Sequence, residues 1–268
     1  MLGLFHRLSV MSFAFPALSL RFVPVWRRNL LVWRKLALPS LLGNLADPMI
    51  YMFGLGFGLG AMLADVNGVP YIAFLAAGTI CFSTMNTATF EALFSAFSRM
   101  HVQRTWDAIL NAPVTLDDVV LAEMLWAATK SLLSGTAILL VAWALGLTHS
   151  LTALWILAVI PLVGLCFSSI ALCVTALSPS YDFFSYYFTL VVTPMGMLCG
   201  VFFPTAQMPE ALQVFAALLP LSHATDLVRP LFLGEIPNNI LLHVLVLLGY
   251  AIAAFWIAVV LFRRRLLS

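Results

Sequence analysis

Apolar residues along the chain fall into six runs, each about as long as the ~20-residue helix that crosses a lipid bilayer. The runs lie near 38–62, 70–97, 117–145, 152–177, 182–203 and 240–262. The first run is interrupted by Asp47-Pro48 and by the alternating glycines from Gly54 to Gly60, so we expect it to be kinked or packed closely against a neighbour. The pattern predicts an all-α membrane protein with a six-helix transmembrane domain over residues 38–268.

A cationic amphipathic segment precedes the first run, over residues 21–37. Its basic residues gather on one side of a helical projection and its tryptophans on the other, with Asn29 and Leu31 as exceptions. Such a helix lies in the headgroup layer of a membrane. It either anchors the fold or forms the edge of a lateral entrance for a lipid-like substrate. The candidate entrance residues are Trp26, Arg27, Arg28, Trp33, Arg34 and Lys35.

Two other segments are apolar without reaching spanning length. Prolines at 204, 209, 220 and 230 interrupt the segment 204–239, which predicts two short re-entrant helices that dip into the outer interface. Residues 1–20 faintly resemble a signal peptide, but cleavage there would carry the basic stretch after them across the membrane. We therefore expect a leader that stays cytoplasmic or interfacial, without an assigned structure.

Composition and charge agree with a membrane location and set its orientation. Hydrophobic residues make up 63% of the 268 residues and charged residues 9%, whereas soluble proteins average roughly 25% charged residues. With six spans, most of the 13 Lys and Arg residues fall on one side: before the first span, after the second and at the C-terminus. The positive-inside rule then predicts that both termini are cytoplasmic.

The loop after the second span is predicted to form a short amphipathic helix over residues 99–110. Its apolar face contains Val102, Trp106, Ile109 and Leu110, and its polar face contains Arg99, Arg104 and Asp107. A short helix wedged between two membrane helices is what a cytosolic partner needs to push on a transmembrane domain. The plainer alternative is an interfacial turn helix.

No nucleotide site accompanies this loop. The chain has only two lysines, Lys35 and Lys130, and neither follows a glycine-rich phosphate-binding loop. Any ATP hydrolysis would therefore be supplied by another subunit. The third span begins at Thr115–Asp118, whose sequence TLDD is a capping box with acidic groups at the positive end of the helix dipole.

Ionisable residues inside membrane spans are costly and are therefore candidates for function. Asp47, Glu91 and Lys130 lie within the predicted spans. Glu91 and Lys130 lie at depths that allow a pair across the second and third helices. Such a pair would be a structural ion pair, a part of the translocation path or a proton relay. A single acid–base pair is a poor relay.

Aromatic residues open the fifth span at the inner face. Tyr181, Tyr186 and Tyr187 belong to an interfacial belt, or they stack on sugar rings. The four cysteines lie in apolar runs without metal-ligand spacing, so we expect no metal site. Motifs of a hydrolase or metalloenzyme are absent from the sequence as well, which argues against an enzyme.

Several longer blocks resemble the type-2 ABC exporter permeases, and within them the NodJ branch. These blocks are MNTATFE (85–91), RMHVQRTWDAILNAP (99–113), TLDD (115–118), SPSYDFF (178–184), FFPTAQMP (202–209) and HATDLVRP (223–230). The resemblance covers roughly residue 21 to the C-terminus. Permeases of this branch export lipo-chitooligosaccharide nodulation factors together with the ATPase NodI.

The resemblance implies a permease homodimer in the bacterial inner membrane, bound to two NodI-like ATP-binding subunits. ATP and Mg²⁺ would be bound by those subunits and no cofactor by this chain. Residues 99–110 would form the coupling helix, and the amphipathic helix would lie beside a lateral opening. The cargo would be an amphiphilic lipid-linked saccharide moved outward from the inner leaflet, and no nucleic acid would be involved.

Other readings of the sequence stay open at this point. A related permease could export another polysaccharide or a drug. An ion-driven secondary transporter should show inverted halves with paired broken helices, which the sequence does not display. A membrane enzyme or scaffold subunit acting on lipid-linked sugar is the third class.

Overall fold

The computed structural model describes residues 14–267 except for 61, 63–64 and 67, and the side chain of Asp47 is also outside the description. Most of the leader predicted over residues 1–20 therefore lies outside the described residues. The longer helices are α2 (Phe22–Arg34), α3 (Ala37–Gly58), α4 (Tyr71–Phe90), α6 (Leu116–Ala144), α7 (Ile156–Leu177), α11 (Pro220–Leu233) and α12 (Ile240–Leu267). The shorter ones are α5 (Thr105–Leu110), α8 (Asp182–Tyr187), α9 (Thr193–Leu198) and α10 (Glu210–Leu218).

Irregular helical turns extend several of these helices. Two π-helical turns, Glu91–Ser95 and Ser98–Val102, continue α4 toward α5. A third, Phe188–Val192, joins α8 to α9, and 3₁₀ turns lie at Leu151–Trp155 and Thr205–Gln207. The antiparallel hairpin of β1 (Asp65–Val66) and β2 (Val69–Pro70) is the one departure from the predicted all-α fold within the described residues.

Four helices among the described residues are long and apolar enough to cross a membrane. They are Tyr71–Val102, Leu116–Ala144, Leu151–Leu177 and Ile240–Leu267. A fifth crossing is possible if α10 and α11, which meet at 90°, form one broken span. These results confirm a helical multi-pass membrane protein, whereas the count of six spans stays a prediction.

The first and fifth predicted spans are helical but do not meet that test. Helix α3 has 22 residues, which is long enough to cross a membrane, so its composition is what excludes it from the spanning helices. It continues through Pro48 as one helix, and of its alternating glycines Gly56 lies against Ile72 of α4. The short helices between Asp182 and Leu198 are separated by a π-helical turn.

Helix α7 lies at the centre of the bundle and contacts α4, α6, α11 and α12. Small residues allow the closest approach: a Cβ atom at Gly164 of α7 would lie 2.2 Å from the Ser131 hydroxyl of α6. Close contact through small residues is the usual way in which membrane helices pack, because lipid offers no hydrophobic drive for association. Glycine at this position therefore fixes the spacing of α6 and α7.

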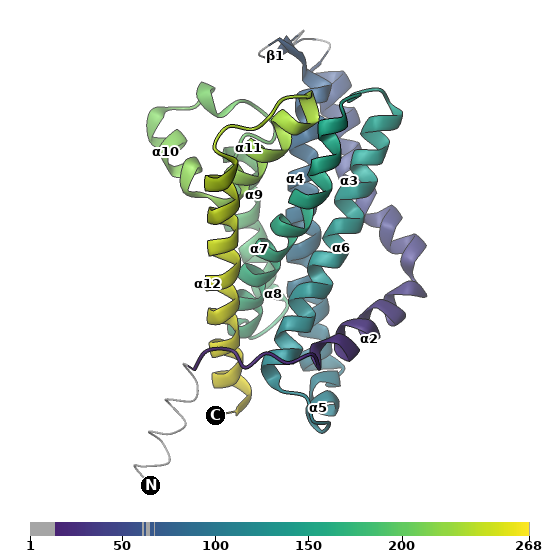
Figure 1. The fold of residues 1–268 in the computed structure, drawn as a ribbon, viewed down its shortest axis with the longest axis vertical. Helices are drawn as coiled ribbons and strands as arrows, with labels where there is room; N and C mark the ends of the chain where they lie inside the picture. Colours follow the sequence, from purple (N-terminus) through teal and green to yellow (C-terminus); the bar gives the residue numbers. More distant parts are fainter. Residues whose placement is uncertain (1–13, 61, 63–64, 67, 268) are drawn as a thin grey trace.

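The two ends of the bundle differ (Figure 1). Helix α5 and the C-terminus lie at one end, and the β1–β2 hairpin and the α11–α12 connection lie at the other. Helix α2 runs along the side of the bundle in the half that contains α5. A buried apolar cluster in this half joins the π-helical continuation of α4 to α5, α6, α7, α8 and α12, and it includes Phe97, Trp106, Phe184 and Phe262.

Candidate functional site

The link between α4 and α6 is broken in two, which corrects the prediction of one helix over residues 99–110. The first part continues α4 as a π-helical turn to Val102. Arg104 then adopts a left-handed conformation with φ of 49°, and a new helix begins at Thr105. The Thr105 hydroxyl donates a hydrogen bond to the Arg99 carbonyl oxygen at 2.8 Å, which holds the two parts together.

This break separates residues that the helical spacing had placed on one face. Val102 is 63% exposed, whereas Trp106 is 1% exposed and packs against Phe262, with ring centroids 5.1 Å apart. Ile109 and Leu110 are half-buried in the same apolar cluster. The predicted shared apolar face is wrong, because Trp106 points into the bundle and Val102 points to solvent.

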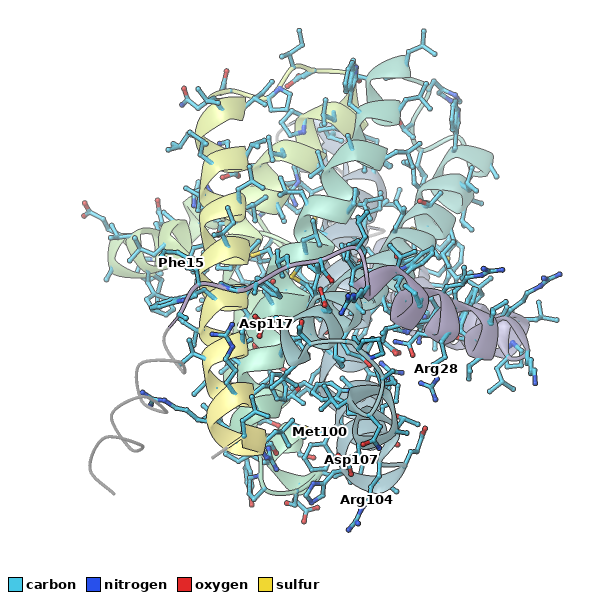
Figure 2. The ribbon with its side chains drawn as sticks, turned by 60° about the horizontal axis from the view of Figure 1, so that its bottom comes forward. Phe15, Arg28, Met100, Arg104, Asp107 and Asp117 are labelled. Carbon is cyan, nitrogen blue, oxygen red and sulfur yellow. The ribbon has the colours of Figure 1, made fainter. Side chains whose placement is uncertain are left out.

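The outward surface of the link includes Val102, Arg104, Asp107 and Ala108, all exposed. Arg104 and Asp107 project from the end of the bundle (Figure 2). Helix α5 is therefore two-faced: one side is fastened to the bundle through Trp106 and the other is free for a partner. Four of the predicted coupling residues are not on this surface: Arg99, Trp106, Ile109 and Leu110.

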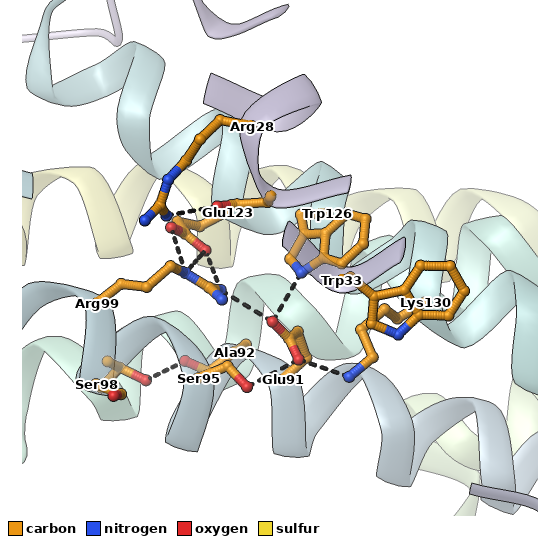
Figure 3. A network of polar contacts seen from close by, with 12 residues as sticks. Arg28, Trp33, Glu91, Ala92, Ser95, Ser98, Arg99, Glu123, Trp126 and Lys130 are labelled. Carbon is orange, nitrogen blue, oxygen red and sulfur yellow. Dashed lines mark hydrogen bonds and ion pairs between the residues drawn. The ribbon is translucent and has the colours of Figure 1, made fainter. Parts of the chain in front are cut away.

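Arg99 belongs instead to a buried ion network between α4 and α6 (Figure 3). Its guanidinium donates from Nε to Glu123 Oε1 at 2.9 Å and from a terminal nitrogen to Glu91 Oε1 at 3.0 Å. Lys130 Nζ lies 2.8 Å from Glu91 Oε2, so the predicted Glu91–Lys130 pair is in contact. The two acids and two bases balance in charge.

Neighbouring side chains donate further hydrogen bonds to the two carboxylates. Glu91 also accepts hydrogen bonds from the Trp126 indole at 2.7 Å and the Ser95 hydroxyl at 2.8 Å. Glu123 accepts a hydrogen bond from the Trp106 indole at 3.2 Å. Glu123 is therefore the residue that ties α5 to both α4 and α6.

Sequence reasoning missed Glu123 and misplaced Arg99. Glu123 lies seven residues before Lys130 on α6, and Arg99 lies eight residues after Glu91 along α4. Spacings of seven and eight residues return to one helix face. That spacing was the available signal, since it aligns two acids and two bases along two adjacent helices.

The predicted capping box at the start of α6 is present, and it has further partners. The Thr115 hydroxyl accepts from the Asp118 backbone N–H, and the Asp118 carboxylate accepts from the Thr115 N–H. Asp118 also accepts from the Ser19 N–H at 2.8 Å, and Asp117 forms an ion pair with Arg263 of α12. These contacts tie the segment before α2 and the end of α12 to the start of α6, around α5.

Helix α2 is shorter than the predicted interfacial segment 21–37 and packs along α6. The Trp26 indole donates to the Thr129 hydroxyl at 3.1 Å, and the Trp33 ring lies edge-on to Trp126 with centroids 6.0 Å apart. Arg27, Arg34 and Lys35 are exposed, as a helix lying among charged headgroups requires. Asn29, an exception in the amphipathic pattern, is 3% exposed.

A cavity of about 480 Å³ lies between α2, the π-helical continuation of α4 and the part of α6 around Trp126 and Lys130. Its lining includes Arg28, Asn29 and Trp33 of α2 together with Glu91, Arg99 and Lys130 of the ion network. Of the three predicted sugar-stacking tyrosines, Tyr181 lines the cavity. Tyr186 is 65% exposed outside the lining, and Tyr187 is half-buried among apolar side chains.

Comparisons with known proteins agree on one family. The model of the ABC-2 type transporter family matches residues 21–233, from the start of α2 to the end of α11. Nodulation protein J of Bradyrhizobium diazoefficiens is 53% identical over 94% of this chain and 96% of its own length, and that of Rhizobium leguminosarum bv. viciae is 54% identical over 94% and 97%. Inner membrane transport permease YadH of Escherichia coli is 24% identical over 78% of this chain and 82% of its own length.

Proposed function

The chain belongs to the ABC-2 type transporter family, and from that premise we propose that it is the permease subunit of an ATP-driven exporter of a lipid-linked oligosaccharide. Family membership makes it a multi-pass transport subunit rather than an enzyme. The proposal adds the energy source and the cargo. Two copies of this chain would assemble with two NodI-like subunits, which bind the ATP and Mg²⁺.

The proposed cargo is a lipo-chitooligosaccharide or a close relative. Relatives more than half identical over nearly the whole chain carry the name nodulation protein J, which connects this chain to the nodulation systems. The cavity beside α2 supports an amphiphilic cargo, because it combines aromatic rings, amides and charged groups next to a helix suited to the headgroup layer. The saccharide would move from the inner leaflet outward.

The proposed topology has six spans in the bacterial inner membrane, with both termini cytoplasmic. Helix α3 and the segment from Asp182 to Leu198 would supply the first and fifth spans. The end of the bundle that holds α5 also holds Arg104 and the basic C-terminus, Arg263–Arg265. Basic residues favour the cytoplasmic side, so this end would face the ATPase.

The observation that carries the proposal is the two-faced geometry of α5. Its inner side is held by Trp106 and Glu123, and its outer side presents Arg104 and Asp107 to solvent. A partner that moves this surface would therefore move the ends of α4 and α6 with it. This is the arrangement that an external ATPase needs to drive a membrane domain.

Charge reversal at Asp107 tests the proposed contact. Asp107→Lys is expected to lower co-purification of the ATP-binding subunit about tenfold, which corresponds to ~1.4 kcal/mol. The reason is that an exposed charge at an interface is replaced by one of the wrong sign, while the buried side of α5 is unchanged. Co-purification from detergent and ATP-driven uptake of labelled lipo-chitooligosaccharide into inside-out vesicles are the two measurements.

Glu210→Lys is the matched control, since Glu210 is an exposed acid at the start of α10, away from α5. It is expected to leave co-purification and uptake unchanged. If Asp107→Lys and Glu210→Lys both behaved like the unmodified protein, the ATPase would not bind at α5. Uptake that proceeded without any ATP-binding subunit would refute the proposed function itself.

A further inference from the structure

The cavity beside α2 contains charged groups that already have partners. Arg99 and Lys130 are bound by Glu91 and Glu123, and the four side chains are between 1% and 14% exposed. An anionic ligand would have to compete with these carboxylates for the same cations. The cavity therefore offers little net positive charge for a phosphate group, apart from Arg28 at its α2 side.

Asn29 supplies a hydrogen-bond donor that nothing in the described protein uses. Its side-chain oxygen accepts from Arg28 at 3.1 Å, but its Nδ2 is buried and has no hydrogen-bond partner among the residues that the structure describes. The residue is 3% exposed and lines the cavity. A buried donor without a partner costs about 1–3 kcal/mol, so its position in the cavity wall points to a ligand acceptor.

Aromatic rings form other parts of the cavity wall. Tyr181 stacks on Phe94 with ring centroids 6.2 Å apart and planes at 11°, and both rings line the cavity. Trp33 of α2 also lines the cavity and lies edge-on to Trp126. The volume of about 480 Å³ falls in the range of roughly 300–1,000 Å³ that is typical of small-molecule sites.

We propose that this cavity binds a neutral sugar ring at the polar end of the cargo, with the Asn29 amide donating to a sugar oxygen and the Tyr181 and Trp33 rings packing against its faces. The inference rests on the proposed function, because it takes the cargo to carry a saccharide. It adds which part of the cargo the site holds and which residues select it. The hydrophobic chain of the cargo would stay in the lipid outside α2.

Asn29→Leu separates ligand binding from folding. Leucine is close to asparagine in size and removes the unpartnered amide, so the variant is expected to melt at the same or a higher temperature. The affinity for N-acetylchitotetraose, a neutral soluble sugar, is expected to fall about three- to tenfold, because one hydrogen bond is lost. A thermal melt of the full-length chain in detergent measures the first effect, and calorimetric titration measures the second.

Two tyrosines in one cluster provide a matched pair. Tyr181→Ala removes a ring that lines the cavity, whereas Tyr186→Ala removes one that is 65% exposed outside it. We expect the affinity for N-acetylchitotetraose to fall at least tenfold in Tyr181→Ala and to stay unchanged in Tyr186→Ala. Tyr181→Phe, which keeps the ring, is expected to retain most of the affinity.

Three results would overturn the inference. The first is that the unmodified chain shows no saturable binding of N-acetylchitotetraose. The second is that Asn29→Leu and Tyr181→Ala bind this sugar as tightly as the unmodified chain does. The third is that glycerol 3-phosphate displaces the sugar and binds more tightly. The last result would identify a phospholipid headgroup as the ligand. The titration contains neither ATP nor the ATP-binding subunit, so its outcome is independent of whether the chain is an ATP-driven exporter.

Discussion

Replacing Glu123 with alanine is expected to destabilise the protein by about 3–5 kcal/mol and to abolish export. Glu123 is 1% exposed and accepts hydrogen bonds from Arg99 of the α4 extension and Trp106 of α5. Its removal leaves a buried guanidinium with Glu91 as its remaining carboxylate partner, and Glu91 is shared with Lys130. Helix α5 also loses its hydrogen bond to α6.

Glu123→Gln is the informative control. The amide keeps the shape and an acceptor oxygen for Trp106 but loses the charge that Arg99 requires. We expect a stability between those of the unmodified protein and Glu123→Ala, with export reduced rather than lost. Thermal melting in detergent and vesicle uptake measure the two effects. If Glu123→Ala melted like the unmodified protein, the buried network would not hold this end of the bundle.

Trp106→Ala is expected to cost about 3–5 kcal/mol, the usual price of removing a large buried side chain. The ring is 1% exposed and packs on Phe262 of α12, so the substitution opens a cavity where α5 meets the bundle. The variant should lose export because α5 is no longer fastened. This reason differs from the sequence prediction, in which Trp106 belonged to the apolar face of the coupling helix that the ATPase would push.

Trp106→Phe distinguishes the two reasons. Phenylalanine fills most of the site and loses only the hydrogen bond to Glu123, so we expect a loss of about 1 kcal/mol and retained export. Melting curves of both variants, with and without the ATP-binding subunit, are the measurement. If Trp106→Ala kept the stability of the unmodified protein but no longer bound the ATPase, Trp106 would be a surface contact for the ATPase rather than a buried anchor of α5.

Much of the fold follows from composition and periodicity alone. The apolar runs that became Tyr71–Val102, Leu116–Ala144, Leu151–Leu177 and Ile240–Leu267 are visible because lipid permits few polar residues in a span. The capping box at Thr115 is also visible, since its spacing is local. Helix α3 is harder to assign, because its polar residues and prolines lower its hydropathy while the chain stays helical.

The site could be predicted only in part. The contact between Glu91 and Lys130 follows from helix geometry, because residues at equal depth in the membrane lie side by side on neighbouring helices. The direction of Trp106 does not follow, because the left-handed residue Arg104 breaks the helix and rotates what comes after it. Periodicity assumes an unbroken helix, and nothing in the local sequence marks Arg104 as the break.

The most direct test of this account is the side of the membrane from which α5 can be reached. Ala108→Cys places a thiol on the exposed surface of α5, and three of the four native cysteines are buried. We predict that a membrane-impermeant maleimide labels this thiol in inside-out vesicles but not in intact spheroplasts, and that the ATP-binding subunit protects it. Glu235→Cys, in the α11–α12 connection, should show the opposite accessibility. Labelling of Ala108→Cys from outside would contradict the account.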